Sequence, residues 1–167
     1  MATATHLDAR TVAASVTDPE MPMLSLEDLG VLRGVEVDEG RVVVTITPTY
    51  SGCPAMATMR DDLVRTLQEH GFAEVTVEVS LTPAWSSDWI TDRGRAALRE
   101  HGISPPGAAP RRQGPVPLTL GRPERAICCP RCGSEHADLV SEFGATACKA
   151  IYRCTACLEP FEHVKEI

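Results

Sequence analysis

Two stretches of the chain alternate apolar and polar residues with a period of two. In "VEVDEGRVVVTITP", Val35 and Val37 alternate with acidic residues, and the apolar positions of 42–46 share one face after the turn at 38–40. The same alternation returns in "EVTVEVSL", residues 74–81. Because successive side chains of a strand point to opposite faces, these patterns predict a β-hairpin and a third strand.

Three other stretches have helical patterns. A short helix over 7–17 should end at Asp18, because the residue before a proline disfavours helical backbone. The clearest helix is "PAMATMRDDLVRTLQEHG", where methionine and leucine recur at spacings of three and four and Gly71 suits the C-terminal cap. A weaker pattern over 87–101 ends at Gly102. The order α, β, β, α, β, α predicts an α/β (α+β) fold with helices packed on a small three-stranded sheet.

A stretch rich in proline and glycine follows these elements. "SPPGAAPRRQGPVPLTLGRP", residues 104–123, has neither helical nor strand periodicity and should be extended. We therefore expect a first domain over 1–105, a linker over 106–124 and a second domain over 125–167. The alternative that this stretch is an arm lying on a partner or on its own domain stays open.

The second domain carries two C-x-x-C pairs. They are "CPRC", from Cys129 to Cys132, and "CTAC", from Cys154 to Cys157. Two such turns on facing hairpins direct four thiolates to one point, which is the tetrahedral arrangement that zinc prefers. The second pair argues against a thioredoxin-like redox site, the rival interpretation of "CPRC" alone. We expect a β-rich zinc ribbon whose folding depends on the metal.

The choice between zinc and iron rests on spacing. The interval from Cys148 to Cys154 is one residue longer than in the plant-type ferredoxin motif that Cys148, Cys154 and Cys157 otherwise resemble. This difference favours zinc over an iron-sulfur cluster, although iron is not excluded. Cys148 stands beside Lys149, whose cation could stabilise a thiolate. Burial as a small apolar side chain is an equal alternative for Cys148.

Composition narrows the classes of partner. The chain has 167 residues, a formal net charge of −7 and a pI of about 5.2, and residues 124–167 hold five Lys and Arg against seven Asp and Glu. This acidic balance argues against binding of nucleic acid or anionic membranes. There is no run of about 18 apolar residues and no export-signal pattern at the start. We expect a cytoplasmic protein whose seven cysteines serve metal or redox chemistry rather than disulfides.

A single cysteine stands apart from the others. In "SGCP", Cys53 is expected at the N-cap of the central helix, where the helix macrodipole favours a negative sulfur. The alternative is a buried thiol without chemistry. Of the two tryptophans, we expect Trp89 in the core and Trp85 near Cys53 at the same edge of the sheet. No carboxylate pair, nucleophile–base pair or phosphate loop accompanies them, so an independent enzyme is not expected.

Several motifs together carry a family resemblance. "DPEMPMLSLEDLGVL", "TPTYSGCPA" and "VSLTPAWSSDWI" resemble the small domain of SufT-type iron-sulfur assembly factors. Followed by "CPRCGS", "SEFGATACKAIYRC" and "CLEPFEHVK", that domain closely resembles the PaaD family of the bacterial aerobic phenylacetate pathway. The likeness extends from about Asp18 to Lys165, and the combination of both modules makes it specific.

The resemblance implies an accessory protein that matures the multicomponent phenylacetyl-CoA epoxidase, delivering an iron-sulfur cluster to its ferredoxin-like reductase subunit. It assigns iron handling to the "DPE" group, with Asp18 and Glu20, and to Cys53, and it assigns zinc to the ribbon cysteines. One cysteine cannot hold a cluster, so a homodimer, Cys148 or a thiolate of the recipient must complete a transient site. Expected partners are the reductase and oxygenase subunits and the iron-sulfur assembly machinery. The rival hypothesis is a structural or regulatory subunit of the epoxidase that docks through the ribbon.

Overall fold

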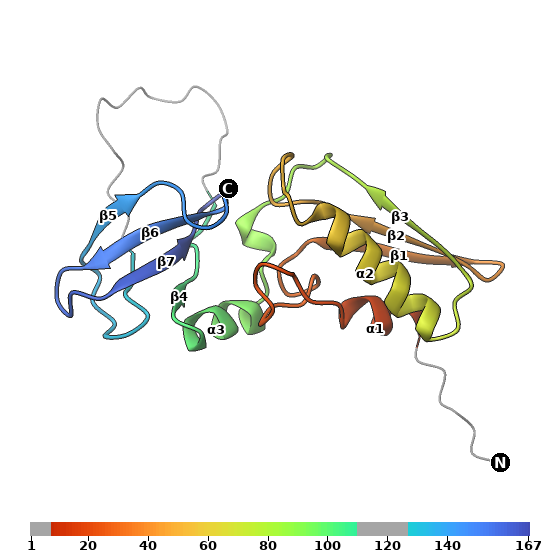
Figure 1. Ribbon diagram of the computed structural model, residues 1–167, viewed down its shortest axis with the longest axis horizontal. Helices are drawn as coiled ribbons and strands as arrows, with labels where there is room; N and C mark the ends of the chain where they lie inside the picture. The colour runs from red at the N-terminus through yellow and green to blue at the C-terminus, as the bar shows by residue number, and fades with distance from the viewer. Residues whose placement is uncertain (1–7, 110–126) are drawn as a thin grey trace, which may run out of the picture. The chain divides into compact units, whose positions relative to one another are not determined.

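The alternating stretches form one sheet in the first part of the chain. The computed structural model describes residues 8–109 and 127–167, which belong to two compact units, Met1–Ala97 and Leu98–Ile167 (Figure 1). In the first unit, β1 (Leu32–Asp38) and β2 (Arg41–Ile46) form an antiparallel hairpin, and β3 (Glu74–Val79) lies parallel to β2. The sheet order is β1-β2-β3. The predicted three-stranded sheet is confirmed.

The alternating valine and isoleucine residues show which face of this sheet is covered by helices. Val42, Val44 and Ile46 of β2 are fully buried, and in register they align with Val75, Val77 and Val79 of β3. The helices α1 (Ala9–Ala14) and α2 (Met56–Glu69) pack against each other, α1 against β1 and α2 against β3. The stripe of α2 that faces the core is completely buried, and it consists of Met59, Leu63 and Leu67.

The start of α2 differs from expectation. Its N-cap is Ala55, which makes no side-chain capping hydrogen bond, and the helix begins at Met56. Cys53 therefore precedes the N-cap by two residues and is not the capping residue. The reason is local: the Cys53 carbonyl already accepts from the Met56 N–H at 3.3 Å, so a separate turn comes before the helix.

The predicted helix over 87–101 is interrupted. It consists of a 3-10 turn η1 (Ser87–Trp89) and a helix α3 (Asp92–Glu100). The break occurs because the Thr91 hydroxyl accepts from the Gly94 N–H at 3.0 Å and so caps a new helix.

The two tryptophans differ in burial from what the sequence suggested. Trp85 is buried, 3% exposed, and its indole N–H donates to the Leu29 carbonyl at 3.0 Å. Trp89, expected in the core, is only partly buried, and the Arg33 guanidinium lies 3.7 Å above its ring. The expectation for Trp89 was wrong because its ring lies under a cation at the surface, whereas the indole of Trp85 finds a buried acceptor.

The second unit is a four-stranded ribbon. Its strands are β4 (Ile103–Ser104), β5 (Ala137–Ser141), β6 (Lys149–Cys154) and β7 (Pro160–Val164), in the order β4-β7-β6-β5. A small core of Ile127, Cys129, Cys154 and Phe161 packs against Tyr152 and Ala137. The C-terminal β-rich module predicted from the cysteine pairs is present.

This second unit begins earlier than the boundary expected at residue 105. Ile103 and Ser104 of β4 pair in parallel with Glu162 and His163 of β7, so the chain before the proline-rich stretch contributes a strand to the ribbon sheet. Residues 110–124 of the expected linker lie outside the described part of the chain. Among the described helices, none has both the length and the apolar composition that crossing a membrane requires.

Candidate metal centre and thiol site

Two matching turns hold the four cysteines of the ribbon. In the first, the Gly133 N–H donates to the Cys129 carbonyl at 2.9 Å, and Gly133 has a positive φ of 73° that suits a residue without a Cβ. In the second, the Leu158 N–H donates to the Cys154 carbonyl at 3.1 Å, with Leu158 at a φ of 63°. Each turn thereby directs two sulfurs to the same side of the ribbon.

The sulfur atoms of the two turns converge. The Sγ atoms of Cys129 and Cys157 are 3.8 Å apart, those of Cys132 and Cys154 are 3.6 Å apart, and all four lie within 4.8 Å of one another. A tetrahedral zinc site with Zn–S bonds of about 2.3 Å has sulfur–sulfur distances of about 3.8 Å. Two of the sulfur–sulfur distances agree with this value, so the four thiols form a group that could hold a metal ion.

The pKa values of two of these thiols are shifted in opposite directions. The Cys157 backbone N–H donates to Cys154 Sγ at 3.5 Å and lowers the pKa of Cys154 to about 6, although burial opposes this shift. The Glu159 N–H acts to lower the pKa of Cys157, but burial and the neighbouring sulfurs outweigh it and raise that pKa to about 12. A metal ion binds thiolates rather than thiols, so metal binding at this site should release protons.

Two further cysteines of the ribbon lie apart from this cage. Cys128 is exposed, and its thiol donates to the Gly133 carbonyl at 3.4 Å. Cys148 is 7% exposed, and its sulfur lies 3.1 Å from the Thr146 hydroxyl. The Lys149 ammonium, the cation expected beside Cys148, donates instead to Glu162 at 2.8 Å. The position of Cys148 therefore agrees with burial as a small side chain.

Cys53 lies at one end of the sheet of the first unit. It is partly buried in the loop between β2 and α2, and its N–H donates to the Tyr50 carbonyl at 3.2 Å. Since β2 and β3 are parallel, their carboxyl ends meet at the same edge, and the Ser80 N–H after β3 donates to the Ile46 carbonyl at 2.9 Å. The loops that follow the two strands thus share this end of the sheet (Figure 1).

The acidic residues of "DPE" take different positions. Asp18 is buried, 5% exposed, and its Oδ1 accepts from the N–H groups of Glu20 and Met21, both at 2.8 Å. Its carboxylate therefore shapes the turn after α1. Glu20 is exposed. These residues and Cys53 belong to the first unit, whereas Cys148 belongs to the second.

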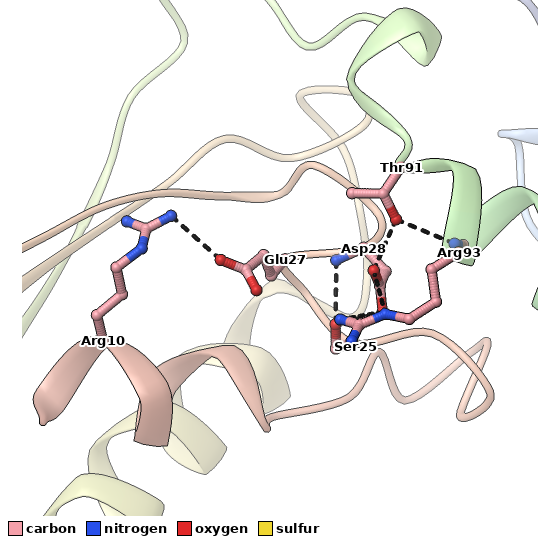
Figure 2. Close-up of polar contacts among 7 residues, drawn as sticks. Arg10, Ser25, Glu27, Asp28, Thr91 and Arg93 are labelled. Atoms are coloured by element: carbon pink, nitrogen blue, oxygen red, sulfur yellow. Dashed lines mark hydrogen bonds and ion pairs between the residues drawn. The ribbon is translucent and has the colours of Figure 1, made fainter. Parts of the chain in front are cut away.

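The pattern-based analysis missed a polar cluster around Asp28. Its carboxylate accepts from the Thr91 hydroxyl at 2.6 Å, from Arg93 Nε at 2.9 Å and from the Ser25 hydroxyl at 3.0 Å (Figure 2). Partial burial would raise the pKa of Asp28, but these hydrogen bonds, led by Arg93, hold it below the ordinary value. The sequence feature that could have indicated this cluster is the aspartate between two leucines in "SLEDLG". If the leucines are buried, the aspartate is buried with them and requires hydrogen-bond partners.

A second buried polar cluster fastens β4 to the ribbon. His163 is 2% exposed, with Nδ1 at 3.1 Å from the Ser104 hydroxyl and Nε2 at 3.2 Å from Glu166 Oε1. The same carboxylate accepts from the Gly107 N–H at 3.0 Å. Burial opposes ionisation of Glu166, but the hydrogen bonds from His163 and Gly107 lower its pKa to about 2.

Comparison with known proteins agrees with this two-part architecture. The family model described as "Iron-sulfur cluster assembly protein" matches residues 8–81, and the "PaaD zinc beta ribbon domain" matches residues 113–165. A protein of Escherichia coli K12, provisionally named as a subunit of 1,2-phenylacetyl-CoA epoxidase, is 46% identical over 153 residues, covering 91% of this chain and 87% of its own.

Two more distant matches each cover little more than half of this chain. An Fe-S protein maturation auxiliary factor of Porphyromonas gingivalis is 29% identical over 96 residues, 56% of this chain and 90% of its own. The crystal structure of a DUF59 domain, a domain of unknown function, from Bacillus anthracis is 28% identical, with a TM-score of 0.51 over 54% of this chain and 87% of that chain. The likeness thus includes both sequence and fold.

Proposed function

Because the chain belongs to the PaaD family, we propose that it is a non-catalytic accessory protein that delivers an iron-sulfur cluster to the multicomponent phenylacetyl-CoA epoxidase. The observation that carries the proposal is the union, in one chain, of an iron-sulfur assembly domain with the PaaD ribbon. The ferredoxin-like reductase subunit is the proposed recipient, with the oxygenase subunits and the assembly machinery as further partners. The acidic balance of the chain supports a protein partner over nucleic acid, and the cytoplasm is the proposed location.

We assign the exchangeable iron ligand to Cys53. Its partly buried position in a loop suits a thiolate that binds iron and then releases it, in contrast to a sulfur held in a closed cage. Delivery would be a ligand exchange without net electron transfer. The Fe–Sγ bond to Cys53 breaks, a bond to a recipient thiolate forms, and the proton of the recipient thiol passes to Cys53 or to solvent.

The remaining ligands of the transient cluster come from outside this loop. A recipient thiolate or a second copy of the chain is favoured over Cys148, which is buried against Thr146. Glu20, exposed beside the turn that Asp18 shapes, is a further candidate for contact with iron or the recipient. The ribbon cysteines would hold zinc, which supplies structural cross-linking of the two turns.

A second function is favoured by one observation. Three large apolar side chains of the ribbon, Val140, Phe143 and Leu158, are 61%, 61% and 59% exposed. Such residues suit docking onto another protein, as a structural or regulatory subunit of the epoxidase would require.

The two functions differ in what happens to iron. The protein is purified without oxygen, reconstituted with iron and sulfide, and mixed with apo-reductase. The wild type should carry a labile visible-absorbing cluster and restore the reductase spectrum. Cys53→Ala should not, whereas Cys128→Ala, the exposed thiol beside the cage, should behave as wild type. If Cys53→Ala restores the spectrum equally well, the proposed role of Cys53 fails, and restoration by Cys148→Ala would exclude Cys148 as an essential ligand.

A further inference from the structure

The two loops near Cys53 share an unusual composition. Residues 47–59, "TPTYSGCPAMATM", and residues 79–87, "VSLTPAWSS", contain no Asp, Glu, Lys or Arg, in a chain in which 23% of residues are charged. These segments are far apart in the sequence. The absence of charge from both therefore becomes informative if the fold brings them together.

The sheet does bring them together. Ile46 and Val79 are register partners at the ends of the parallel strands β2 and β3, and the Ser80 N–H bonds to the Ile46 carbonyl at 2.9 Å. Residues 47–57 and 79–84 consequently lie at one end of the sheet, and we call these two segments the uncharged end (Figure 1). The opposite end holds the hairpin turn with Asp38, Glu39 and Arg41. These two segments are thus without charge, although Arg33 of β1 lies at the same end of the sheet, directly after Leu32, the register partner of Ile46.

Apolar side chains are exposed at the uncharged end. Val79 is 43% exposed and Leu81 is 57% exposed, and Pro54 and Ala84 are exposed as well. Protein interfaces are distinguished by depletion of charge at their centre, together with apolar side chains that lose water on binding. A surface that recognised phosphate or a carboxylate ligand would instead require cations or a row of N–H donors.

We propose that the uncharged end is the docking surface for the recipient iron-sulfur protein, which would present a complementary apolar surface around its own cluster-binding thiols. This inference rests on the proposed function, because Cys53 lies within the surface and docking would bring the recipient thiolates next to it. A second copy of this chain is a poorer occupant, since each copy carries a net charge of −7 and the exposed apolar side chains are few. A small apolar contact suits a partner that must leave after delivery.

The chain offers a matched pair of substitutions for the test. Leu81 and Val37 are each 57% exposed, but Leu81 lies at the uncharged end and Val37 lies beside the hairpin turn. Leu81→Glu and Val37→Glu therefore place the same charge on equally exposed sites of the same unit. Each full-length variant is loaded with its cluster, and binding to the apo-reductase subunit is titrated at low and high salt.

We expect Leu81→Glu to weaken binding to apo-reductase by tenfold or more and to slow cluster transfer in proportion. Val37→Glu should bind within twofold of wild type. Wild-type affinity should change little with salt, because apolar contacts are not screened. Unchanged cluster absorption and unchanged tryptophan fluorescence of Leu81→Glu would exclude misfolding as the cause.

Each other outcome is decisive. If Leu81→Glu binds and transfers as wild type does, or if Val37→Glu is equally impaired, the docking surface is refuted while delivery itself stands. If Leu81→Glu loses binding but the wild type transfers no cluster, docking stands and the proposed delivery function fails. If wild type does not bind apo-reductase, or if Leu81→Glu alters only self-association in sedimentation, the assignment of the recipient to this surface is overturned.

Discussion

Substitution of Asp28 by asparagine tests whether the buried carboxylate holds the first unit together. The two side chains have nearly the same shape, so the substitution changes charge and hydrogen bonding rather than volume. Asp28 joins the loop before β1, through Ser25, to the start of α3, through Thr91 and Arg93 (Figure 2). In the Asp28→Asn variant, the amide NH₂ group would face the Arg93 guanidinium or the Ser25 hydroxyl, where an acceptor is required.

The size of the effect follows from these contacts. A hydrogen bond to a charged group contributes about 1.5–3 kcal/mol, and breaking a set of them around one carboxylate would cost more if all partners were buried. Arg93 is 73% exposed, so solvent screens its ion pair with Asp28. We therefore expect this pair to contribute no more to the free energy of unfolding than an ordinary surface ion pair does. The better protected bonds to Thr91 and Ser25 remain, and we expect Asp28→Asn to lower the free energy of unfolding by about 2 kcal/mol.

The neighbouring residue supplies the control. Glu27 pairs with Arg10 at 3.1 Å, but both side chains are largely accessible to solvent, at 34% and 54%. Glu27→Gln should therefore cost less than about 0.5 kcal/mol. Both tryptophans of the chain lie in the first unit, so urea unfolding followed by tryptophan fluorescence reports on that unit alone.

The pH dependence gives a second criterion. The pKa of Asp28 is lowered in the folded protein, so its stabilisation is present above the unfolded value of 3.8 and is lost as the pH falls through the folded pKa. The difference between wild type and Asp28→Asn should be full at pH 7 and should shrink below about pH 4. Equal losses for Asp28→Asn and Glu27→Gln, or a difference that persists at low pH, would refute the reasoning.

Three further substitutions test other parts of the structure. Cys129→Ser should abolish stoichiometric zinc in metal analysis, whereas Cys128→Ser should retain it, and zinc retained by Cys129→Ser would contradict the cage. Glu166→Gln should speed hydrogen exchange of the Gly107 amide at neutral pH. Because the pKa of Glu166 is lowered to about 2, the wild type should lose the protection of this amide only as the pH falls from about 4.5 toward 2. Gly30→Ala should destabilise the first unit by about 1–3 kcal/mol more than Gly40→Ala in urea unfolding, because only at Gly30 would the new Cβ lie 2.6 Å from Trp89.

The repeat of apolar residues along the chain was sufficient to predict most helices and strands of the first unit. The hairpin, β3 and α2 follow directly from apolar positions with periods of two and about four, although only β2 and α2 bury that face completely. The break before α3 was not predictable in this way. It depends on the Thr91 hydroxyl, which accepts from Gly94 and donates to Asp28, a residue 63 positions away. Periodicity contains no information on such a distant partner.

The start of the second unit was missed for a related reason. Ile103 and Ser104 are too few to show an alternating pattern, and their strand exists because it pairs with the edge of β7 and because His163 bonds to Ser104. The prolines that follow made this segment resemble the beginning of a linker. The proximity of the four ribbon cysteines, in contrast, could be predicted because a four-thiolate metal site requires a fixed local spacing that the sequence displays.

The same contrast separates the two kinds of thiol in this protein. The four ribbon cysteines converge within 4.8 Å, so a bound metal would have all its ligands from one unit and little reason to exchange. Cys53 lies in a different unit, without a charged residue in its own loop. A metal-sulfur cluster on Cys53 would need ligands from a partner, and a partner would approach most readily where no charge must be desolvated. In the proposed delivery, an incomplete ligand set and an uncharged surface would therefore serve the same purpose, which is to hold a cluster only until another protein completes its coordination.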